Sequence, residues 1–307
     1  MFVDLKTSKD MRGTCGFCLE TADLQNSHVL PAFVFRWLRR RGTGHIRASS
    51  NPNLRVQDGE KRRWLCKTCE QNFGRYESLF AEKLFRPWSN GQYTIQYEEW
   101  FLKFCVSVSW RVLTHCKGKN PDHRYTAAED EAAEAAAQRW KAFLRDEVPH
   151  PGKFEQHVIP FDVVEETSDP DMPTNISRYL TGAIEMDIVG SSTNMMTYAK
   201  LGRFVIFGIV RPGQYKFEGT KVHVRSGTLR PGKFVLPGPL LGFFKGRARS
   251  VQAIYDSISP NQQAKIDANL LANIDNFTKS DQFRSLMADA EMFGRSAIIR
   301  KEVPNSG

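Results

Sequence analysis

The spacing of apolar positions changes near Pro149. Before this point, apolar residues recur at helical intervals, as at Phe73, Tyr76, Phe80 and Leu84, which predict one packed helix face. After it, runs rich in Val, Ile, Phe and Tyr are separated by Gly, Pro and Asn, which is typical of strands and turns. The chain is therefore predicted to be an α+β protein, with helices in its first half, a β-rich region after them and helices again at its end.

Helix start and stop signals locate these helices. We expect them to begin at Pro31, to run from Lys67 to about Phe85 with a stop at Pro87, to cover residues 97–117 and 127–144, and to begin again after Pro239, at Ser259-Pro260 and at Ser280-Asp281. The helices over 97–117 and 127–144 are predicted to form a hairpin that packs against the N-terminal segment. The polar, turn-rich stretch from Gly42 to Arg63 predicts a loop with at most a weak hairpin.

Four later stretches have strand-like composition: residues 154–164, 176–189, 195–210 and 221–237. A chain of 307 residues has a length typical of about two domains. We accordingly divide it into an N-terminal module at 1–90, a helical connector at 91–148 and a β-rich α+β domain at 149–307. The composition of this last part predicts no role.

Composition excludes two classes of protein. Hydrophobic residues make up 41% and charged residues 25% of the chain, which is ordinary for a globular protein. No apolar run approaches the ~20 residues that a membrane span needs, and the N-terminus lacks the apolar core of a secretory signal. We therefore expect a cytoplasmic protein with no membrane partner, and a homo-oligomer remains open.

Most of the net charge of +9 lies in one segment, between Arg36 and Arg63, where nine Arg or Lys face only two acidic residues. A basic block of this density predicts a surface for a nucleic-acid backbone, because each neutralised phosphate releases counterions. The alternative is a solvated loop with a basic bias. The candidate phosphate-binding residues are Arg36, Arg39, Arg40, Arg41, Lys61, Arg62 and Arg63.

Four cysteines form two pairs of the same spacing, Cys15-x2-Cys18 and Cys66-x2-Cys69. Two such pairs, tens of residues apart, supply four soft ligands for tetrahedral zinc. A disulfide is the weaker interpretation for a cytosolic protein, and a redox motif would need one pair rather than two. We predict a structural Zn2+ site that stabilises a small basic module.

Around these cysteines the sequence resembles the zinc-containing branch of the HNH endonucleases, which share the ββα-metal (treble-clef) fold. The residues that carry the resemblance are "CGFC", "SHVLP" and "WLCKTCEQNF" within residues 12–85. In that family, one cysteine pair precedes a strand that ends in a histidine, and the second pair begins a helix. The resemblance implies hydrolysis of nucleic-acid phosphodiester bonds, with DNA as the expected substrate. Proteins of this build often act in DNA metabolism or in defence against foreign DNA.

Carried over to this chain, the resemblance makes His28 the general base that deprotonates a water. It makes Glu70, directly after the last cysteine, a ligand of a catalytic Mg2+ or Mn2+. Glu77 lies seven residues further along the helix, where it can be a second ligand or can orient the first. Two departures stand out: Ser27 occupies the position where the family usually has a metal-binding acid or histidine, and no asparagine lies just before Cys66 to orient the base.

Each catalytic candidate also has a structural interpretation. His28 can be a structural histidine, Glu70 can interact with the helix dipole at a helix start, and Glu77 can form a salt bridge with Arg75 or Lys83. Two functions follow. The first is an HNH-like metal-dependent endonuclease. The second, favoured by Ser27, is a zinc-stabilised nucleic-acid-binding module without turnover.

Overall fold

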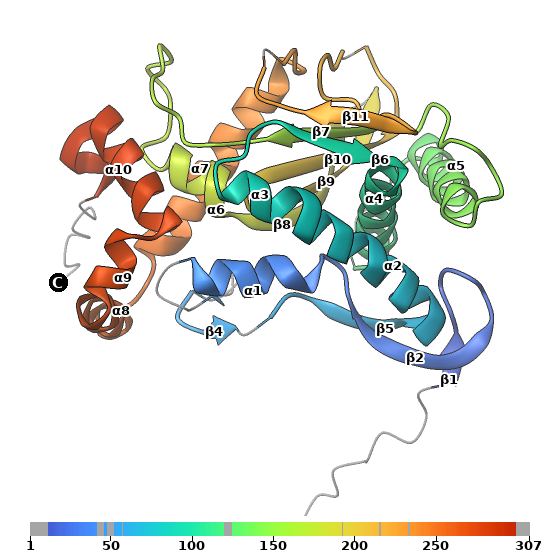
Figure 1. The fold of residues 1–307 in the computed structure, drawn as a ribbon, viewed down its shortest axis with the longest axis horizontal. Helices are drawn as coiled ribbons and strands as arrows, with labels where there is room; N and C mark the ends of the chain where they lie inside the picture. Colours follow the sequence, from blue (N-terminus) through green and yellow to red (C-terminus); the bar gives the residue numbers. More distant parts are fainter. Residues whose placement is uncertain are drawn as a thin grey trace, which may run out of the picture.

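The computed structural model describes residues 12–41, 46–47, 52–56, 58–119, 125–191, 193–214, 216–232 and 234–298. Helices and sheets are mixed throughout, which confirms the predicted α+β class. In Figure 1 the N-terminal segment (blue) lies along the lower side, the largest sheet lies at the centre and the last helices (red) lie at the left. Within the described ranges, no helix combines the length and the apolar character needed to cross a bilayer.

The N-terminal segment forms a three-stranded antiparallel sheet with a helix directly after its last strand. Its elements are β1 (Arg12–Thr14), β2 (Thr21–His28), α1 (Ala32–Arg40), β3 (Ile46–Arg47), β4 (Arg55–Val56), β5 (Lys61–Cys66) and α2 (Lys67–Phe80). The sheet order is β1-β2-β5. Strands β3 and β4 pair with each other, which is the weak hairpin predicted for this loop. Because β2 pairs with β5, the end of β2 lies beside the strand that leads into α2.

The sequence predicted that the helix starting at Lys67 stops at Pro87. The structure shows instead that the chain stays helical past this residue. It passes into a π-helical turn, Ala81–Phe85, and then into a last turn, α3 (Arg86–Ser89). Pro87 lies in the first turn of α3. A proline is tolerated in a first turn because its missing N–H would have no partner there. The π-helical turn therefore lets the chain remain helical through a residue that usually stops a helix.

A long buried helix connects the two halves of the chain. After β6 (Ile95–Glu98), α4 (Glu99–Lys119) runs against α2 on one side and against the central sheet on another. Helix α5 (Ala127–Leu144) packs beside it as the predicted hairpin partner. Helix α5 begins with a capping box, in which the Thr126 hydroxyl accepts from the Glu129 N–H (3.3 Å) and the Glu129 carboxylate accepts from the Thr126 N–H (2.8 Å).

The central sheet is antiparallel and is covered on both faces. Its strands are β7 (Gln156–Pro160), β8 (Ile184–Ser191), β9 (Asn194–Leu201) and β10 (Phe204–Arg211), in the order β7-β10-β9-β8. In β10, Phe204 and Ile206 join the core shared with α4, while Val205 and Phe207 join a second core with α6 and α7. Alternate side chains point to opposite faces of a strand. Burial on both faces therefore explains why β10 is a nearly continuous apolar run.

The remaining elements cover this sheet or extend from it. They are α6 (Ile176–Gly182), β11 (Ser226–Leu229), which pairs with β6, and the helices α7 (Pro239–Asp256), α8 (Pro260–Ala272), α9 (Ile274–Thr278) and α10 (Asp281–Phe293), followed by a 3-10 turn (Gly294–Ala297). Ser259 and Ser280 cap α8 and α10, as their sequence positions predicted.

The strand-like reading of residues 176–189 is wrong in its first half, which forms α6. Ile176, Tyr179 and Leu180 have helical spacing and are buried. A carboxylate from a distant helix satisfies the start of α6: Asp289 of α10 accepts from the Ser177 N–H at 2.7 Å and from the Arg178 N–H at 3.2 Å. Because this capping residue lies more than a hundred positions away in the sequence, the residues around α6 could not predict the cap.

One hydrophobic core draws on all three parts of the chain. It contains Phe73 and Phe80 of α2, Phe104 of α4, and Phe204 of β10, and Phe80 stacks on Phe104 with ring centroids 4.1 Å apart. The boundaries at residues 90 and 148 therefore divide the chain only in sequence. In space, the N-terminal module is packed against the rest of the molecule.

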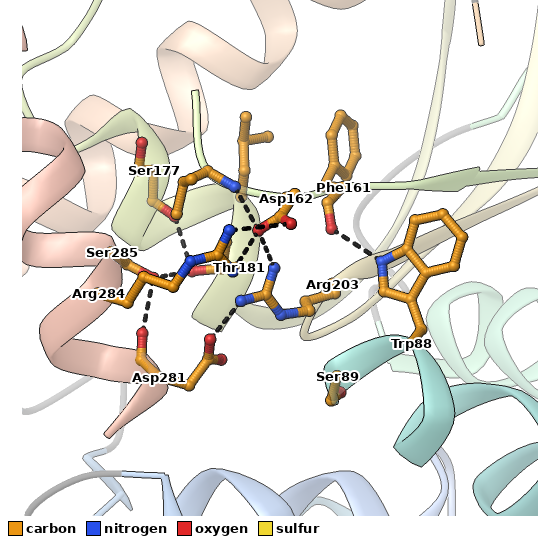
Figure 2. A network of polar contacts seen from close by, with 12 residues as sticks. Trp88, Ser89, Phe161, Asp162, Ser177, Thr181, Arg203, Asp281, Arg284 and Ser285 are labelled. Atoms are coloured by element: carbon orange, nitrogen blue, oxygen red, sulfur yellow. Dashed lines mark hydrogen bonds and ion pairs between the residues drawn. The ribbon is translucent and has the colours of Figure 1, made fainter. Parts of the chain in front are cut away.

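A buried charge network joins α1, the sheet and α10. The Arg203 guanidinium, 1% exposed, donates to Asp162 at 2.5 Å and also to Asp281 (Figure 2). Asp281, at the start of α10, also accepts from Arg41 at 2.8 Å. Arg41 is 7% exposed, and burial lowers its pKa to about 10, against the opposing effect of Asp281. Its grouping with the phosphate-binding residues is corrected, because this guanidinium is enclosed and already engaged.

A second buried group predicts a pH dependence of stability. His157 of β7 lies between Thr220, whose Oγ1 is 3.0 Å from Nδ1, and Glu155, and it stacks on Phe217. Burial lowers its pKa to about 4, and Lys221 adds to this effect while Glu155 opposes it. The folded state therefore favours neutral imidazole. The stability is fully present above pH 6.5, and it falls as pH drops toward 4 because only the unfolded chain takes up the proton.

Between pH 7 and pH 4.5, we expect the free energy of unfolding of the His157→Gln variant to fall by roughly 2–3 kcal/mol less than that of wild type. The measurement is urea unfolding at both pH values. His150→Gln, at an exposed position, is the control and should show the full loss. Equal pH dependence in wild type and His157→Gln would contradict the prediction.

Candidate metal centre and adjoining residues

Four cysteine thiols meet where the β1–β2 turn contacts the start of α2. Cys15 and Cys18 lie in that turn, Cys66 ends β5 and Cys69 lies in the first turn of α2. Their Sγ atoms all lie within 4.8 Å of one another, and none is in a disulfide. Pairing of β2 with β5 thus brings together the two halves of a ligand set that the sequence keeps far apart.

Backbone hydrogen bonds shape the turn that carries the first pair. The Leu19 N–H donates to the Cys15 carbonyl at 2.9 Å, and Leu19 adopts a φ of +68°. The Gly16 N–H donates to the Trp64 carbonyl at 2.7 Å, which holds the turn against β5. Both thiols of the turn are therefore directed to the strand that ends in Cys66.

The spacing of the thiols fits a tetrahedral metal ion. The Sγ atoms of Cys18 and Cys66 are 3.8 Å apart. Zinc–sulfur bonds of ~2.3 Å place tetrahedral sulfurs ~3.8 Å from one another, whereas a disulfide needs ~2.05 Å. The four cysteines therefore form a site suited to a metal ion such as zinc, as their spacing in the sequence predicted.

The thiols do not ionise alike. Burial raises the pKa of Cys15, but backbone hydrogen bonds from Cys18, Cys66 and Phe17 outweigh it and lower the value to about 7. Burial and the neighbouring Cys66 raise the pKa of Cys69 well above its usual range. Crowded thiolates repel one another, and a bound cation is what stabilises all four in the charged form.

Beside this centre, Ser27 contacts Glu70. The Ser27 hydroxyl, on β2, donates to Oε2 of Glu70, on α2, at 2.5 Å. Ser27 is buried and Glu70 is half-buried. These are the two positions at which the resemblance to HNH endonucleases expects metal ligands, and the fold places them in direct contact.

His28 ends β2 and faces a carboxylate that sequence reasoning did not select. Its Nε2 lies 2.8 Å from Oδ2 of Asp58, which is ion-pair distance, although the contact does not have hydrogen-bond geometry. Lys61 also lies 2.8 Å from Asp58. Burial raises the pKa of the Asp58 carboxyl, but the close contacts with Lys61 and His28 and the hydrogen bond from the Gly59 N–H outweigh it and lower the value to about 2. Asp58 is therefore charged at neutral pH and can orient the imidazole.

His28 and Glu70 do not touch. Ser27 and His28 are consecutive in β2, so their side chains leave the strand on opposite sides. In the part of the chain that the structure describes, no hydrogen bond or ion pair links His28 with Glu70. The two candidates flank the end of β2.

Glu77 is engaged elsewhere. Its Oε1 accepts from Nη1 of Arg111, on α4, at 2.6 Å, and both side chains are largely enclosed. The salt-bridge alternative for Glu77 thus has Arg111 as its partner, and neither Arg75 nor Lys83. Glu60, another acid near the site, binds Lys119 at 3.0 Å. Among the described residues, the four cysteines are the one group of three or more His, Cys, Asp or Glu that can hold an ion.

The basic candidates differ in exposure. Those that are exposed are Arg36, Arg40, Lys61, Arg62 and Arg63, while Arg39 is half-buried. Arg62 packs its guanidinium 5.0 Å from the centre of the Trp64 ring, and Arg63 donates to the Leu24 carbonyl. Both side chains are thus partly held against the surface of the module. Binding of a phosphate backbone by these residues remains a prediction.

Two residues near the site were missed by sequence reasoning. Asp58 lies in a polar loop, and no local pattern distinguishes it from other acids. Arg111 offered a signal: a guanidinium within a strongly apolar helix needs a buried partner. That partner, Glu77, is visible only in the tertiary structure.

No family profile, curated protein or solved structure matches this chain.

Proposed function

We propose that the N-terminal module is an HNH-like, metal-dependent endonuclease that hydrolyses phosphodiester bonds of nucleic acid, with DNA as the first substrate to test. The four-cysteine centre would brace the module, and the end of β2 would carry the reaction. The exposed basic residues of α1 and β5 would hold the phosphate backbone.

The observation that carries the proposal is the contact between Ser27 and Glu70. It joins a strand end to a helix start beside the cysteine centre, and it lies next to His28. The contact supports the proposal because the ββα-metal resemblance expects these two metal positions to lie side by side, with the base next to one of them in the strand. Asp58 supplies an orienting group for His28 in place of the expected asparagine.

Glu70 and Ser27 fit the needs of a hard cation in part. Mg2+ keeps several waters and usually takes only one or two carboxylates together with substrate phosphates, and Glu70 supplies one carboxylate. A divalent cation bound there would neutralise charge on the phosphate and on the leaving oxygen. Glu77 is not part of this set, because its carboxylate is occupied by Arg111.

The residues of this chain would then act as follows. The His28 imidazole takes a proton from a water, which attacks phosphorus while the bond from phosphorus to the leaving oxygen of the strand breaks. Asp58 stabilises the imidazolium that forms. Lys61, which shares Asp58 with His28, lies on the exposed part of β5 and can meet a phosphate of the bound strand.

A second function, nucleic-acid binding without turnover, is favoured by one observation. Ser27 replaces the expected acid, and its hydroxyl donates to Glu70, so this position adds no negative charge to attract a cation. In that case the same zinc-stabilised module would present the basic surface alone.

Plasmid cleavage separates the two functions. We expect wild type to nick or linearise plasmid DNA in Mg2+ or Mn2+, and Glu70→Gln to lose at least ~100-fold in rate, as for loss of a catalytic charge. Glu82→Gln, on an exposed position, is the control and should keep full activity. DNA binding without cleavage under either cation would support the binding module and contradict the nuclease.

A further inference from the structure

Arg111 lies outside the zinc module and yet reaches its proposed site. It projects from α4 and is 2% exposed, although the residues of α4 in this region are mostly apolar. Its Nη1 donates to Glu77 Oε1 at 2.6 Å and to the His28 carbonyl at 3.3 Å, and its Nε donates to the Ser107 carbonyl at 3.2 Å. The guanidinium therefore joins α4, α2 and the end of β2 at one point.

Each of these contacts bears on a residue of the proposed site. The His28 carbonyl belongs to the residue that carries the imidazole. Glu77 lies on α2, two turns after Glu70. The contacts of Arg111 thus set the position of the strand end relative to the helix, and with it the separation of His28 from Glu70.

Stability alone does not explain an arginine here. Nη2 of Arg111 is buried and has no hydrogen-bond partner among the described residues. An unsatisfied buried donor costs about 1–3 kcal/mol, and replacing a buried ion pair by apolar side chains is often neutral or stabilising. The burial of the guanidinium also excludes direct contact with a substrate phosphate in this conformation.

We propose that Arg111 is a positioning residue of the phosphodiesterase site, and that Glu77 acts through it rather than as a metal ligand. The proposal rests on the nuclease function proposed above. It also links the site to the central sheet, because α4, which carries Arg111, packs against β8, β9 and β10.

The test compares cleavage kinetics of wild type, Arg111→Met and Arg111→Lys. Since a displacement of ~1 Å can cost ~100-fold in rate, we expect Arg111→Met to lower kcat ~100-fold with unchanged KM and zinc content. Arg111→Lys should recover part of the loss, because it can still reach Glu77. Glu77→Gln should lower kcat too, and its effect should not add to that of Arg111→Met.

Arg203→Met is the matched control. It breaks the equally buried pairs of an arginine with Asp162 and Asp281, which lie at the sheet and α10, away from the four cysteines and His28. Its kcat should stay near that of wild type, even if its unfolding temperature falls as far as that of Arg111→Met.

The outcomes are distinct. Unchanged kcat in Arg111→Met, or an equal fall in Arg203→Met, overturns the positioning role. A rise in KM together with a smaller salt dependence of DNA binding overturns it as well, since it would show direct phosphate contact. If Arg111→Met does not fold, Arg111→Lys decides by the same criteria. If wild type itself fails to cleave, the nuclease function fails, and the positioning role with it.

Discussion

Replacement of Cys69 by serine is expected to abolish metal binding and to unfold the N-terminal module. Among the described residues, the four thiols are the one group that can join the β1–β2 turn to α2 through a metal ion. Structural zinc contributes ~10 kcal/mol or more to folding in small zinc modules, which is comparable to the ~5–15 kcal/mol net stability of a whole domain. Loss of one ligand therefore removes a large part of the stability of this segment, beyond what its packing in the shared core supplies.

The effect should extend beyond the module. Phe17, in the first turn, packs against Phe73 at 5.0 Å and against Trp110 of α4 at 5.2 Å between ring centroids. When the turn is released, these rings lose their enclosure, and the contact between α2 and α4 weakens. We expect thermal unfolding of Cys69→Ser to begin well below that of wild type.

The measurement is elemental analysis together with thermal unfolding. Wild type should carry one zinc per chain, and Cys69→Ser should carry none. Cys116→Ser is the control, since Cys116 is a free thiol on α4 outside the cluster, and it should keep its zinc. Wild type without metal, or Cys69→Ser with a full equivalent, would show that the thiols do not form one centre.

Replacement of His28 by alanine is expected to lower the cleavage rate by ~100–10,000-fold, which is the usual contribution of a general base. The loss should appear in kcat. The fold should survive, because the His28 side chain is partly exposed and its hydrogen-bonding register in β2 depends on the backbone. Zinc content should equal that of wild type.

His223→Ala is the matched control, because this histidine is exposed and belongs to the second half of the chain. It should cleave as wild type does. If His28→Ala also cleaves at the wild-type rate, the base assignment is wrong, whereas the four-cysteine centre is unaffected by that result.

Local signals in the sequence were sufficient for several features. The two cysteine pairs predicted the metal centre because each pair fits one side of a tetrahedral ion, whatever lies between them. The stretch 127–144 was correctly predicted to be helical, and Ser280 predicted a helix start, because a cap needs only residues a few positions apart. The apolar runs of β9 and β10 predicted strands, since both faces of the sheet are covered.

Other features depend on residues that are distant in the chain. Residues 176–182 are helical because Asp289 caps them, Arg41 is enclosed because Asp281 binds it, and Glu77 is occupied because Arg111 reaches it. The local sequence alone would also allow a strand at residues 176–182, an exposed Arg41 and a Glu77 that binds metal. Their roles follow from charge pairing in a buried environment, where the free energy of a side chain depends on which partner the fold brings within hydrogen-bonding distance. Capping and ligand spacing are encoded over a few residues, and the residues alone predict them, whereas partner choice arises only once α4, α10 and the sheet have packed together.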